Sequence, residues 1–348
     1  MIRVTDIAQA LSLSKMTVSR ALRGEDSVAA PTRERVLAKA AELGYRPDPV
    51  LSALVAYRHG QEHAAGYSQI AFVTNFPPRS SERWGFVRAF FHGAVARGKL
   101  YGYEVVEFPL REQKGRNQRE ASEILFHRGV KGVIVAPLTS GRGHLNLAWG
   151  HFAPVAIGYS LAKPQLHYVA FDHHHAVRSV MHELRKRGYR RIGFVHRYYE
   201  SARIQHQALD AYLGEQYRFP RGPDIPPLSL GELPADTLWT WLAAHRPDAI
   251  VTGSNLASDI IADPRFAEYR QRHALGIVCW ARREIDPLEL AGIVEDWGEV
   301  GAAAVDRVHA QLRCQELGIP RESKGTLLRG AWHEGESLRA EFGWQIAD

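Results

Sequence analysis

The chain has 348 residues, of which 45% are hydrophobic and 24% are charged, a composition typical of a globular protein with room for more than one hydrophobic core. The absence of any run of eighteen apolar residues, of an apolar secretory leader and of closely spaced cysteines argues against a membrane-spanning, secreted or disulfide-stabilised protein and predicts a cytoplasmic one. The net charge is +6, and residues 1–60 hold nine Lys and Arg against six Asp and Glu, a mild local bias compatible with a polyanionic partner.

Residues 1–46 carry the signals of three short helices. Thr5 and Ser14 are placed to cap the first two, because a hydroxyl there accepts a hydrogen bond from a free N–H group of the first turn. The third helix begins near Pro31, which suits a first turn, and glycines follow the second and third helices as stop signals. Apolar residues at helical spacing are expected to form a small shared core: Ile7, Ala8, Leu11, Val18, Ala21, Leu22, Val36, Leu37, Ala40 and Leu43.

The first two helices are joined by a short turn, with small Ala8 at their crossing, and this spacing indicates a helix-turn-helix. In that motif the second helix enters the major groove of DNA with its N-terminal residues at the base edges. From spacing alone, a small helical domain with a solvated face stays the alternative. The predicted DNA-contacting residues, of which Ser19 and Arg20 are expected near phosphates, are Thr5, Ser14, Lys15, Met16, Thr17, Ser19, Arg20 and Arg23.

Residues 47–67 predict a domain boundary, because prolines and a short helix over 50–57 precede a polar linker that contains Ala and Gly. From residue 68 onward, apolar strands alternate with amphipathic helices, a pattern typical of parallel sheets covered by helices. The expected strands cover 69–74, 103–108, 132–137, 154–158, 168–171, 191–196, 248–253 and 274–280. Their two groups predict two doubly wound lobes with ligand contacts in the crevice between them, at the carboxyl ends of the strands. The expected lobes are 68–161 with 290–320 and 162–289 with 321–348.

Specific motifs carry a family resemblance. The segments VTDIAQALSLSKMTVSRALRG and TRERVLAKAAELGYRPDPV resemble the N-terminal domain of the lactose-repressor (LacI/GalR) family over residues 3–47. The region from 69 onward is similar, more weakly but in the same order, to the effector-binding core of that family. The resemblance implies an α/β protein with a helix-turn-helix head (1–46), a hinge helix and linker (47–67) and a two-lobe core (68–348) like that of periplasmic sugar-binding proteins.

The resemblance also implies roles in the head and the hinge. Leu54 falls at the position of a leucine that enters the minor groove, where an apolar wedge unstacks a base step. Lys15 and Met16 occupy the positions that select the operator; Lys suits guanine O6 and N7, and Met suits a thymine methyl group. Ala29 stands where the family has a capping Ser. Since a lost cap costs about 1 kcal/mol, we expect the head to fold weakly without DNA.

An effector site is implied as well. Aromatic faces with Asp, Asn and Arg groups suit a sugar, but Gln205 replaces an arginine of the family, and Ala281 and Arg282 replace two carboxylates. The ligand therefore stays open between a sugar, a sugar acid and another anion. Core packing is the alternative role of each aromatic residue, above all Phe86. The expected effector-binding residues are Trp84, Phe86, Asp172, Arg203, Gln205, Asn255 and Trp280.

His173, His174 and His175 invite interpretation as a metal site. Consecutive residues at a helix start point in different directions, whereas two ligands on one helix face need a spacing of three or four. We therefore expect no metal and favour a polar crevice rim or a subunit contact. The chain also lacks a Walker loop, a G-x-S-x-G elbow and an H-E-x-x-H motif, so neither enzyme activity nor a cofactor is expected.

Together these features predict a transcriptional regulator, most simply a repressor. It is expected to bind double-stranded DNA at a pseudo-palindromic operator as a homodimer and to respond to a small effector, a sugar or sugar derivative. Two alternatives stay open: a sugar-binding module of transport type, and a His-rich metallohydrolase that acts on carbohydrate.

Overall fold

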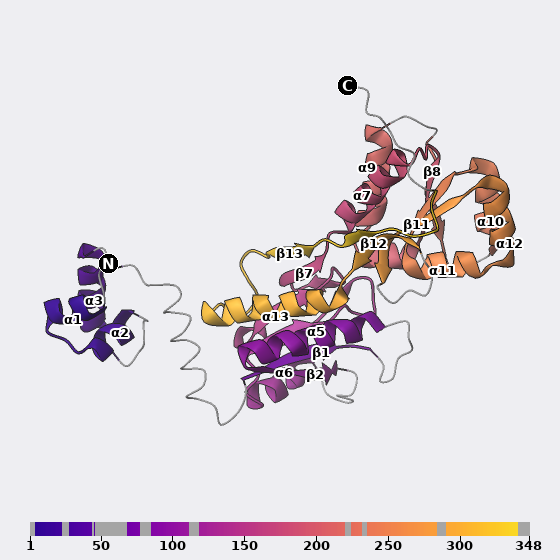
Figure 1. Cartoon of the computed structure of the whole chain (residues 1–348). Helices are drawn as coiled ribbons and strands as arrows, with labels where there is room; N and C mark the ends of the chain where they lie inside the picture. Colours follow the sequence, from indigo (N-terminus) through magenta and orange to yellow (C-terminus); the bar gives the residue numbers. More distant parts are fainter. Residues whose placement is uncertain are drawn as a thin grey trace, which may run out of the picture. The chain divides into compact units, whose positions relative to one another are not determined.

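The computed structural model describes residues 4–22, 28–43, 45, 68–76, 85–110, 118–219, 224–231, 235–283 and 290–339. The chain forms two compact units, Met1–Gly66 and Tyr67–Asp348 (Figure 1). The predicted hinge helix with Leu54, and the predicted contacts Arg23 and Trp84, lie outside the described residues. Within the described parts, no helix is both long enough and apolar enough to cross a lipid bilayer.

The N-terminal unit contains three helices, α1 (Val4–Leu11), α2 (Lys15–Leu22) and α3 (Ala30–Glu42). Each helix contributes one fully buried residue, Ile7, Val18 or Val36, to a single small core, as the apolar spacing predicts. Leu37 is an exception, because 47% of its surface is exposed. It directly follows Val36, and one step along an α-helix turns a side chain by about 100°, away from the buried stripe.

The helix starts of this unit agree with prediction at two positions and differ at one. The Oγ atom of Ser14 accepts a hydrogen bond from the backbone N–H of Thr17 at 3.0 Å, so Ser14 caps α2. Ala29 precedes α3 without a side-chain cap, as expected. The prediction that Thr5 caps α1 is wrong: Thr5 lies inside the first turn, and its hydroxyl donates to Oδ1 of Asp6 at 3.4 Å. A capping residue has to precede the first turn, because only there does its side chain reach the free N–H groups.

The first lobe of the second unit is built on a parallel sheet, described in the order β13-β7-β5-β3-β1-β2. One face of the sheet packs against α5 (Gly85–Tyr101) and α13 (Trp297–Arg313), which run side by side, and the other against α6 (Gln118–His127) (Figure 1). Val300, Ala304 and Val308 follow one another at four-residue spacing along α13, and all three are buried in this core. The strands are β1 (Ser68–Thr74), β2 (Tyr103–Pro109), β3 (Gly132–Val135), β5 (Ala153–Ile157), β7 (His167–Phe171) and β13 (Gly325–Leu328), and a small pair, β4 (Gly143–His144) and β6 (Leu161–Lys163), forms its own ladder.

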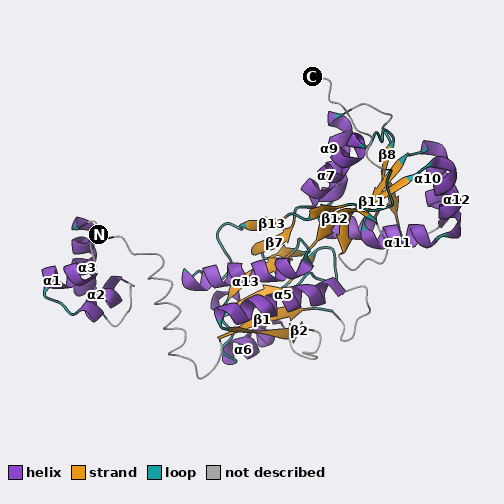
Figure 2. Cartoon of the chain, viewed as in Figure 1, coloured by secondary structure: helices purple, strands orange, loops and turns teal. Residues whose placement is uncertain are grey.

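The second lobe has a sheet in the order β14-β12-β11-β10-β8-β9, with β14 antiparallel to β12 and the other pairs parallel. Helices cover both faces: α7 and α9 pack on one, and α10, α11 and α12 pack on the other (Figure 2). The strands are β8 (Ile192–Arg197), β9 (Leu228–Leu230), β10 (Ala249–Thr252), β11 (Gly276–Arg283), β12 (Ala291–Glu295) and β14 (Ala331–His333). The helices are α7 (His173–Lys186), α8 (Tyr198–Arg203), α9 (Gln207–Arg218), α10 (Ala235–His245), α11 (Ser254–Ala262) and α12 (Pro264–His273).

Sheet membership differs from the sequence prediction at three strands. β7 and β13 belong to the first sheet, although 162–289 and 321–348 were assigned to the second lobe, and β12 belongs to the second sheet, although 290–320 was assigned to the first. The chain therefore changes lobe after β7, after β12 and between β13 and β14. Apolar strands buried on both faces look alike in sequence, so only their long-range pairing decides which sheet they join.

Candidate functional site

The exposed face of α2 carries several of the predicted DNA contacts. Lys15, Met16 and Arg20 are exposed, and 62% of the surface of Met16 is accessible. Val18 and Ala21, on the opposite side of the same helix, are buried in the core of the head. The packing of this unit thus presents a cation, a thioether and a guanidinium together on a short, firmly packed helix.

The start of α2 is held by its cap. The hydroxyls of Ser14 and Thr17 share a hydrogen bond of 2.8 Å, in addition to the backbone bond that caps the helix. These two predicted contacts are therefore fixed relative to one another. Ser19 and Thr5 are both partly buried.

In the second unit, the short helix after β8 of the second lobe bonds to the loop after β3 of the first lobe. Arg203, the last residue of α8, donates from Nη1 to the carbonyl oxygens of Leu138 at 2.5 Å and Thr139 at 3.1 Å, in the loop after β3. Asn75, directly after β1, holds that loop by accepting a hydrogen bond from the N–H of Thr139 at 3.0 Å. Burial lowers the pKa of the Arg203 guanidinium from its ordinary value. The predicted effector residue Arg203 therefore bridges the lobes in this structure.

Five polar side chains, here called the strand-end cluster, lie at or near the carboxyl ends of β7, β8, β10, β11 and β12: His173, His196, Thr252, Trp280 and Glu295. The Nδ1 atom of His173 lies 3.5 Å from Oε1 of Glu295, and its ring meets the Trp280 ring edge to face at 5.3 Å between centroids. Burial lowers the pKa of His196. Each of the five has a buried polar atom that makes no hydrogen bond within the described residues: Nδ1 of both histidines, Oγ1 of Thr252, Nε1 of Trp280 and Oε1 of Glu295. Buried polar atoms are nearly always bonded in proteins, to water where not to other groups, so these atoms make the strand ends a candidate place for a ligand or for bound water.

Aromatic side chains surround part of this cluster. Trp297 donates from Nε1 to Oε2 of Glu295 at 3.4 Å, and the ring of Phe86 meets Trp297 edge to face at 5.5 Å. Phe86 also packs on the core of the first lobe, as its alternative role predicts. Tyr159 approaches His173 at 6.1 Å between ring centroids, and burial raises the pKa of Tyr159 to about 12. The cluster thus combines unbonded polar atoms with aromatic surfaces.

Three of the predicted effector residues make contacts elsewhere or face solvent. Asp172 caps α7 by accepting from the N–H of His175 at 3.0 Å, and its other oxygen accepts from Nε of Arg329 at 3.3 Å. Gln205 is exposed in a left-handed turn with φ of 54°, and Asn255 is exposed on α11. Trp280 is the predicted effector residue that joins the strand-end cluster.

Sequence reasoning singled out His173 as part of a polar crevice rim or a subunit contact, but it missed three other members of the cluster. His196, Thr252 and Glu295 each stand at or near the end of an apolar strand, in IGFVH, DAIVT and AGIVE. A polar residue directly after an apolar run, read together with the rule that ligands bind at the carboxyl ends of parallel strands, is the signal that identifies them.

The three consecutive histidines diverge, as expected for a helix start. His173 joins the cluster, His174 is exposed, and Nε2 of His175 lies 3.4 Å from the hydroxyl of Ser179. In the part of the chain that the structure describes, no group of three or more His, Cys, Asp and Glu residues is arranged to hold a metal ion.

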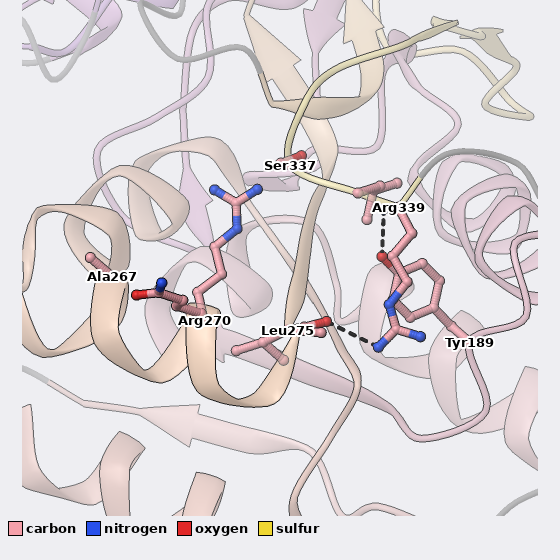
Figure 3. Close-up of a pocket in the computed structure, with 9 residues that line it drawn as sticks. Tyr189, Ala267, Arg270, Leu275, Ser337 and Arg339 are labelled. Carbon is pink, nitrogen blue, oxygen red and sulfur yellow. Dashed lines mark hydrogen bonds between the residues drawn. The ribbon is translucent and has the colours of Figure 1, made fainter.

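A separate hollow of about 420 Å³ lies beside the amino end of β11, where Figure 3 shows Arg270 and Arg339 on either side of Leu275. The guanidinium of Arg270 donates to the carbonyl of Glu336 at 2.8 Å. That of Arg339 donates to the carbonyl of Ala274 at 3.1 Å and lies over the Tyr189 ring. Both arginines are bound to backbone groups, in contrast to the unbonded atoms of the strand-end cluster, so the latter is the stronger candidate for a ligand site.

Comparison with known proteins places these features in context. Residues 3–48 match the model of the family described as bacterial regulatory proteins, lacI family. Over 192 residues the chain is 30% identical to the HTH-type transcriptional regulator PtxS of Pseudomonas plecoglossicida, which covers 55% of this chain and 52% of that protein. It is 24% identical over 196 residues to MalR of Staphylococcus xylosus, covering 56% of each. These two alignments span only about half the length of the relatives, whereas an alignment to PtxS of Pseudomonas putida, 24% identical over 319 residues, covers 90% of both chains.

Solved structures show the same architecture. The lac repressor dimer bound to operator and the anti-inducer ONPF superposes with a TM-score of 0.55 at 17% identity, covering 97% of this chain and 99% of that one. The complex of the transcriptional regulator CelR with cellobiose also gives a TM-score of 0.55, at 18% identity, covering 97% and 100%. At this level of identity the similarity establishes the fold: a helix-turn-helix head followed by a two-lobe core of the periplasmic-binding-protein type.

Proposed function

We propose that this chain, whose residues 3–48 match the lacI family of bacterial regulatory proteins, is a sequence-specific DNA-binding repressor controlled by a small ligand. The observation that carries the proposal is the exposed face of α2. It presents Lys15 and Met16 on a capped helix within the segment that matches the family model. A helix with this composition at its N-terminal turn is suited to reading base edges in the major groove.

Selection from random duplex DNA tests this function with the full chain. We expect enrichment of a pseudo-palindromic site, because a two-fold symmetric dimer places two recognition helices on related half-sites. Affinity for the selected site is expected to fall as salt is raised, since phosphate contacts release counterions. Recovery of no sequence above competitor would contradict the proposal and favour a sugar-binding module without DNA recognition.

Lys15→Ala is expected to weaken binding to the selected site about tenfold or more, because one good base contact contributes about 1–3 kcal/mol. Lys39→Ala is the matched control: it removes the same charge from α3, where Lys39 pairs with Glu42 at 2.6 Å, and is expected to change affinity less than threefold. Fluorescence anisotropy at fixed salt measures both variants on the selected site and on a scrambled duplex. An equal loss on both duplexes would show that Lys15 contributes charge alone and reads no base.

For control by a ligand, we propose that the strand-end cluster binds a sugar or sugar derivative between the two lobes. Its unbonded polar atoms and neighbouring aromatic rings support this class of ligand. A ligand there would favour one arrangement of the lobes over another, and the bonds of Arg203 to Leu138 and Thr139 are the contacts most directly affected. Operator affinity would then change through a population shift.

The proposed assembly is a homodimer, which the family comparison favours because the superposed lac repressor is a dimer on its operator. In this proposal the hinge residue Leu54 enters the minor groove at the centre of the site, and Leu54→Ala would weaken binding to the selected duplex. Light scattering of the free chain measures the assembly directly. A monomer at the concentrations that saturate the selected site would contradict it.

A further inference from the structure

The hollow of about 420 Å³ in the second lobe, here called the arginine hollow, lies at the opposite end of the strands from the strand-end cluster. It opens beside Leu275, which directly precedes β11. α12 forms one wall, the chain at 337–339 forms the other, and Tyr189 reaches it from the turn between α7 and β8 (Figure 3). The strand-end cluster lies at the carboxyl ends of these strands, so the length of β11 separates the two places.

Two guanidinium groups line the arginine hollow, and no Asp or Glu is among the described residues around it. Arg270 is held by a bond from Nη2 to the carbonyl oxygen of Glu336 at 2.8 Å. Arg339 is held by a bond from Nη2 to the carbonyl oxygen of Ala274 at 3.1 Å. A guanidinium has five N–H donors, and these bonds use one of each group. Because both acceptors are neutral, the bonds fix the two cations in place without compensating their charge.

Other arginines of α12 are paired with carboxylates, in contrast to Arg270. Arg265 lies 2.8 Å from an oxygen of Asp263. Arg272 lies 2.8 Å from an oxygen of Glu268. A guanidinium that is already anchored loses less side-chain entropy when it binds a ligand. Arg270 is therefore the arginine of this helix that is both held in place and available to an anion.

Two hydroxyl groups that line the arginine hollow also have a proton to donate. Ser337 and Tyr189 are both more than nine-tenths buried. Oγ of Ser337 accepts from the N–H of Ala291 at 2.8 Å, and the phenol oxygen of Tyr189 accepts from the N–H of Arg339 at 2.9 Å. A hydroxyl can donate as well as accept, and neither of these donates to an acceptor in the part of the chain that the structure describes. The hollow thus combines hydroxyl donors with guanidinium donors.

The end of α12 opposes an anion here, but less strongly than the arginines favour one. The carbonyl end of a helix is equivalent to about half a negative elementary charge, whereas the two guanidinium groups carry two full positive charges. Arg339 also covers the carbonyl group of Ala274. Carboxylate and phosphate oxygens only accept hydrogen bonds, and both groups match the planar fork of a guanidinium. The chemistry of the hollow therefore favours an oxyanion over a cation or a neutral ligand.

We propose that the arginine hollow is a second small-molecule site, separate from the crevice between the lobes, and that it binds a small organic ligand through a carboxylate or phosphate group. In this arrangement the oxyanion accepts from Arg270 and Arg339, and the hydroxyl of Ser337 donates to the same group. Leu275 and Leu338 supply apolar surface for the rest of the ligand. The volume lies within the range of about 300–1,000 Å³ that is usual for small-molecule sites.

Calorimetry with the full chain, in chloride buffer at fixed ionic strength, tests this site. The probes are inorganic phosphate, glycerol phosphate and succinate, with glycerol and succinamide as neutral counterparts. We expect at least one oxyanion probe to bind and its neutral counterpart to give no heat of binding; the phosphates alone would assign a phosphate group, and succinate alone a carboxylate. Arg270→Gln and Arg339→Gln are each expected to weaken binding about tenfold or more, because each removes a charged hydrogen-bond donor.

Arg272→Gln is the matched control, because it removes the same charge from the same helix at an arginine paired with Glu268. It is expected to leave the affinity within twofold, and circular dichroism establishes that each variant is folded. Three results would overturn the inference: no binding of any oxyanion probe, equal binding of the neutral counterparts, or equal losses in Arg270→Gln and Arg272→Gln. None of them would affect the proposed operator recognition, which selection from random DNA tests independently.

Discussion

Gly301→Ala is expected to disrupt the packing of the first lobe. α5 and α13 cross closely at Gly301, where an added Cβ would lie nearer than 3.0 Å to the carbonyl oxygen and carbon of Phe90. That obstacle is helix backbone, which does not rotate away as a side chain does. The two helices would have to separate, so we expect the free energy of unfolding to fall by about 3 kcal/mol or more.

Gly214→Ala in α9 is the matched control, because an added Cβ there meets no atom within 4 Å. The same substitution at this helical position is expected to stabilise the chain by up to about 1 kcal/mol, through the higher helix propensity of alanine. Urea unfolding followed by circular dichroism measures both variants. Equal and small effects at the two glycines would show that α5 and α13 do not approach as closely as the structure indicates.

Glu215→Gln is expected to lower the free energy of unfolding of the second lobe by about 2–3 kcal/mol, since hydrogen bonds to charged groups contribute about 1.5–3 kcal/mol. The carboxylate joins α9 to α7 through Arg178 and Arg185. Glu183→Gln is the control. Glu183 lies on α7, the helix that holds the two arginines, and its carboxylate pairs with Lys186 of the same helix at 2.9 Å near the surface. Exposed pairs contribute little, so a change below about 0.5 kcal/mol is expected there.

The effect of Glu215 also depends on pH, and its sign follows from the pKa. Burial disfavours the charged carboxylate, but the hydrogen bonds and charges of Arg185 and Arg178 outweigh burial and hold the pKa of Glu215 below its ordinary value of 4.5. Such a group stabilises the fold above the unfolded-state pKa, and the contribution is lost as the pH falls through the folded-state pKa. The difference between the wild type and Glu215→Gln is therefore expected to be full at pH 7 and to shrink below pH 4.5. A difference that grows on acidification would contradict this assignment.

The helices of the head could be predicted from sequence because the features that define them involve residues close together in the chain. The cap at Ser14, the missing cap at Ala29 and the stripe through Ile7, Val18 and Val36 all depend on neighbours within one or two helical turns. The error at Thr5 is also local: a cap at Thr5 would start the helix at Asp6, whereas α1 includes Val4, two residues earlier.

The candidate ligand site was less accessible from sequence. Trp280 was expected there and joins the strand-end cluster, but Asp172 is used to cap α7, and Arg203 bridges the lobes. Glu295 was missed because a single carboxylate after a strand looks the same in sequence whether it is hydrated or buried beside a histidine and a tryptophan.

By itself, the amino-acid sequence determined the helix-turn-helix head, the alternation of strands and helices, and the resemblance of the head to the lacI family, because each depends on residue types at short, regular spacing. Tertiary structure decided which strands share a sheet, since β7, β12 and β13 differ in their pairing and not in their local pattern. It also decided which polar atoms stay unbonded at the strand ends. Strand pairing and the surroundings of buried polar side chains both result from long-range packing. The neighbour of a buried carboxylate can lie more than a hundred positions away in the sequence, as His173 does from Glu295.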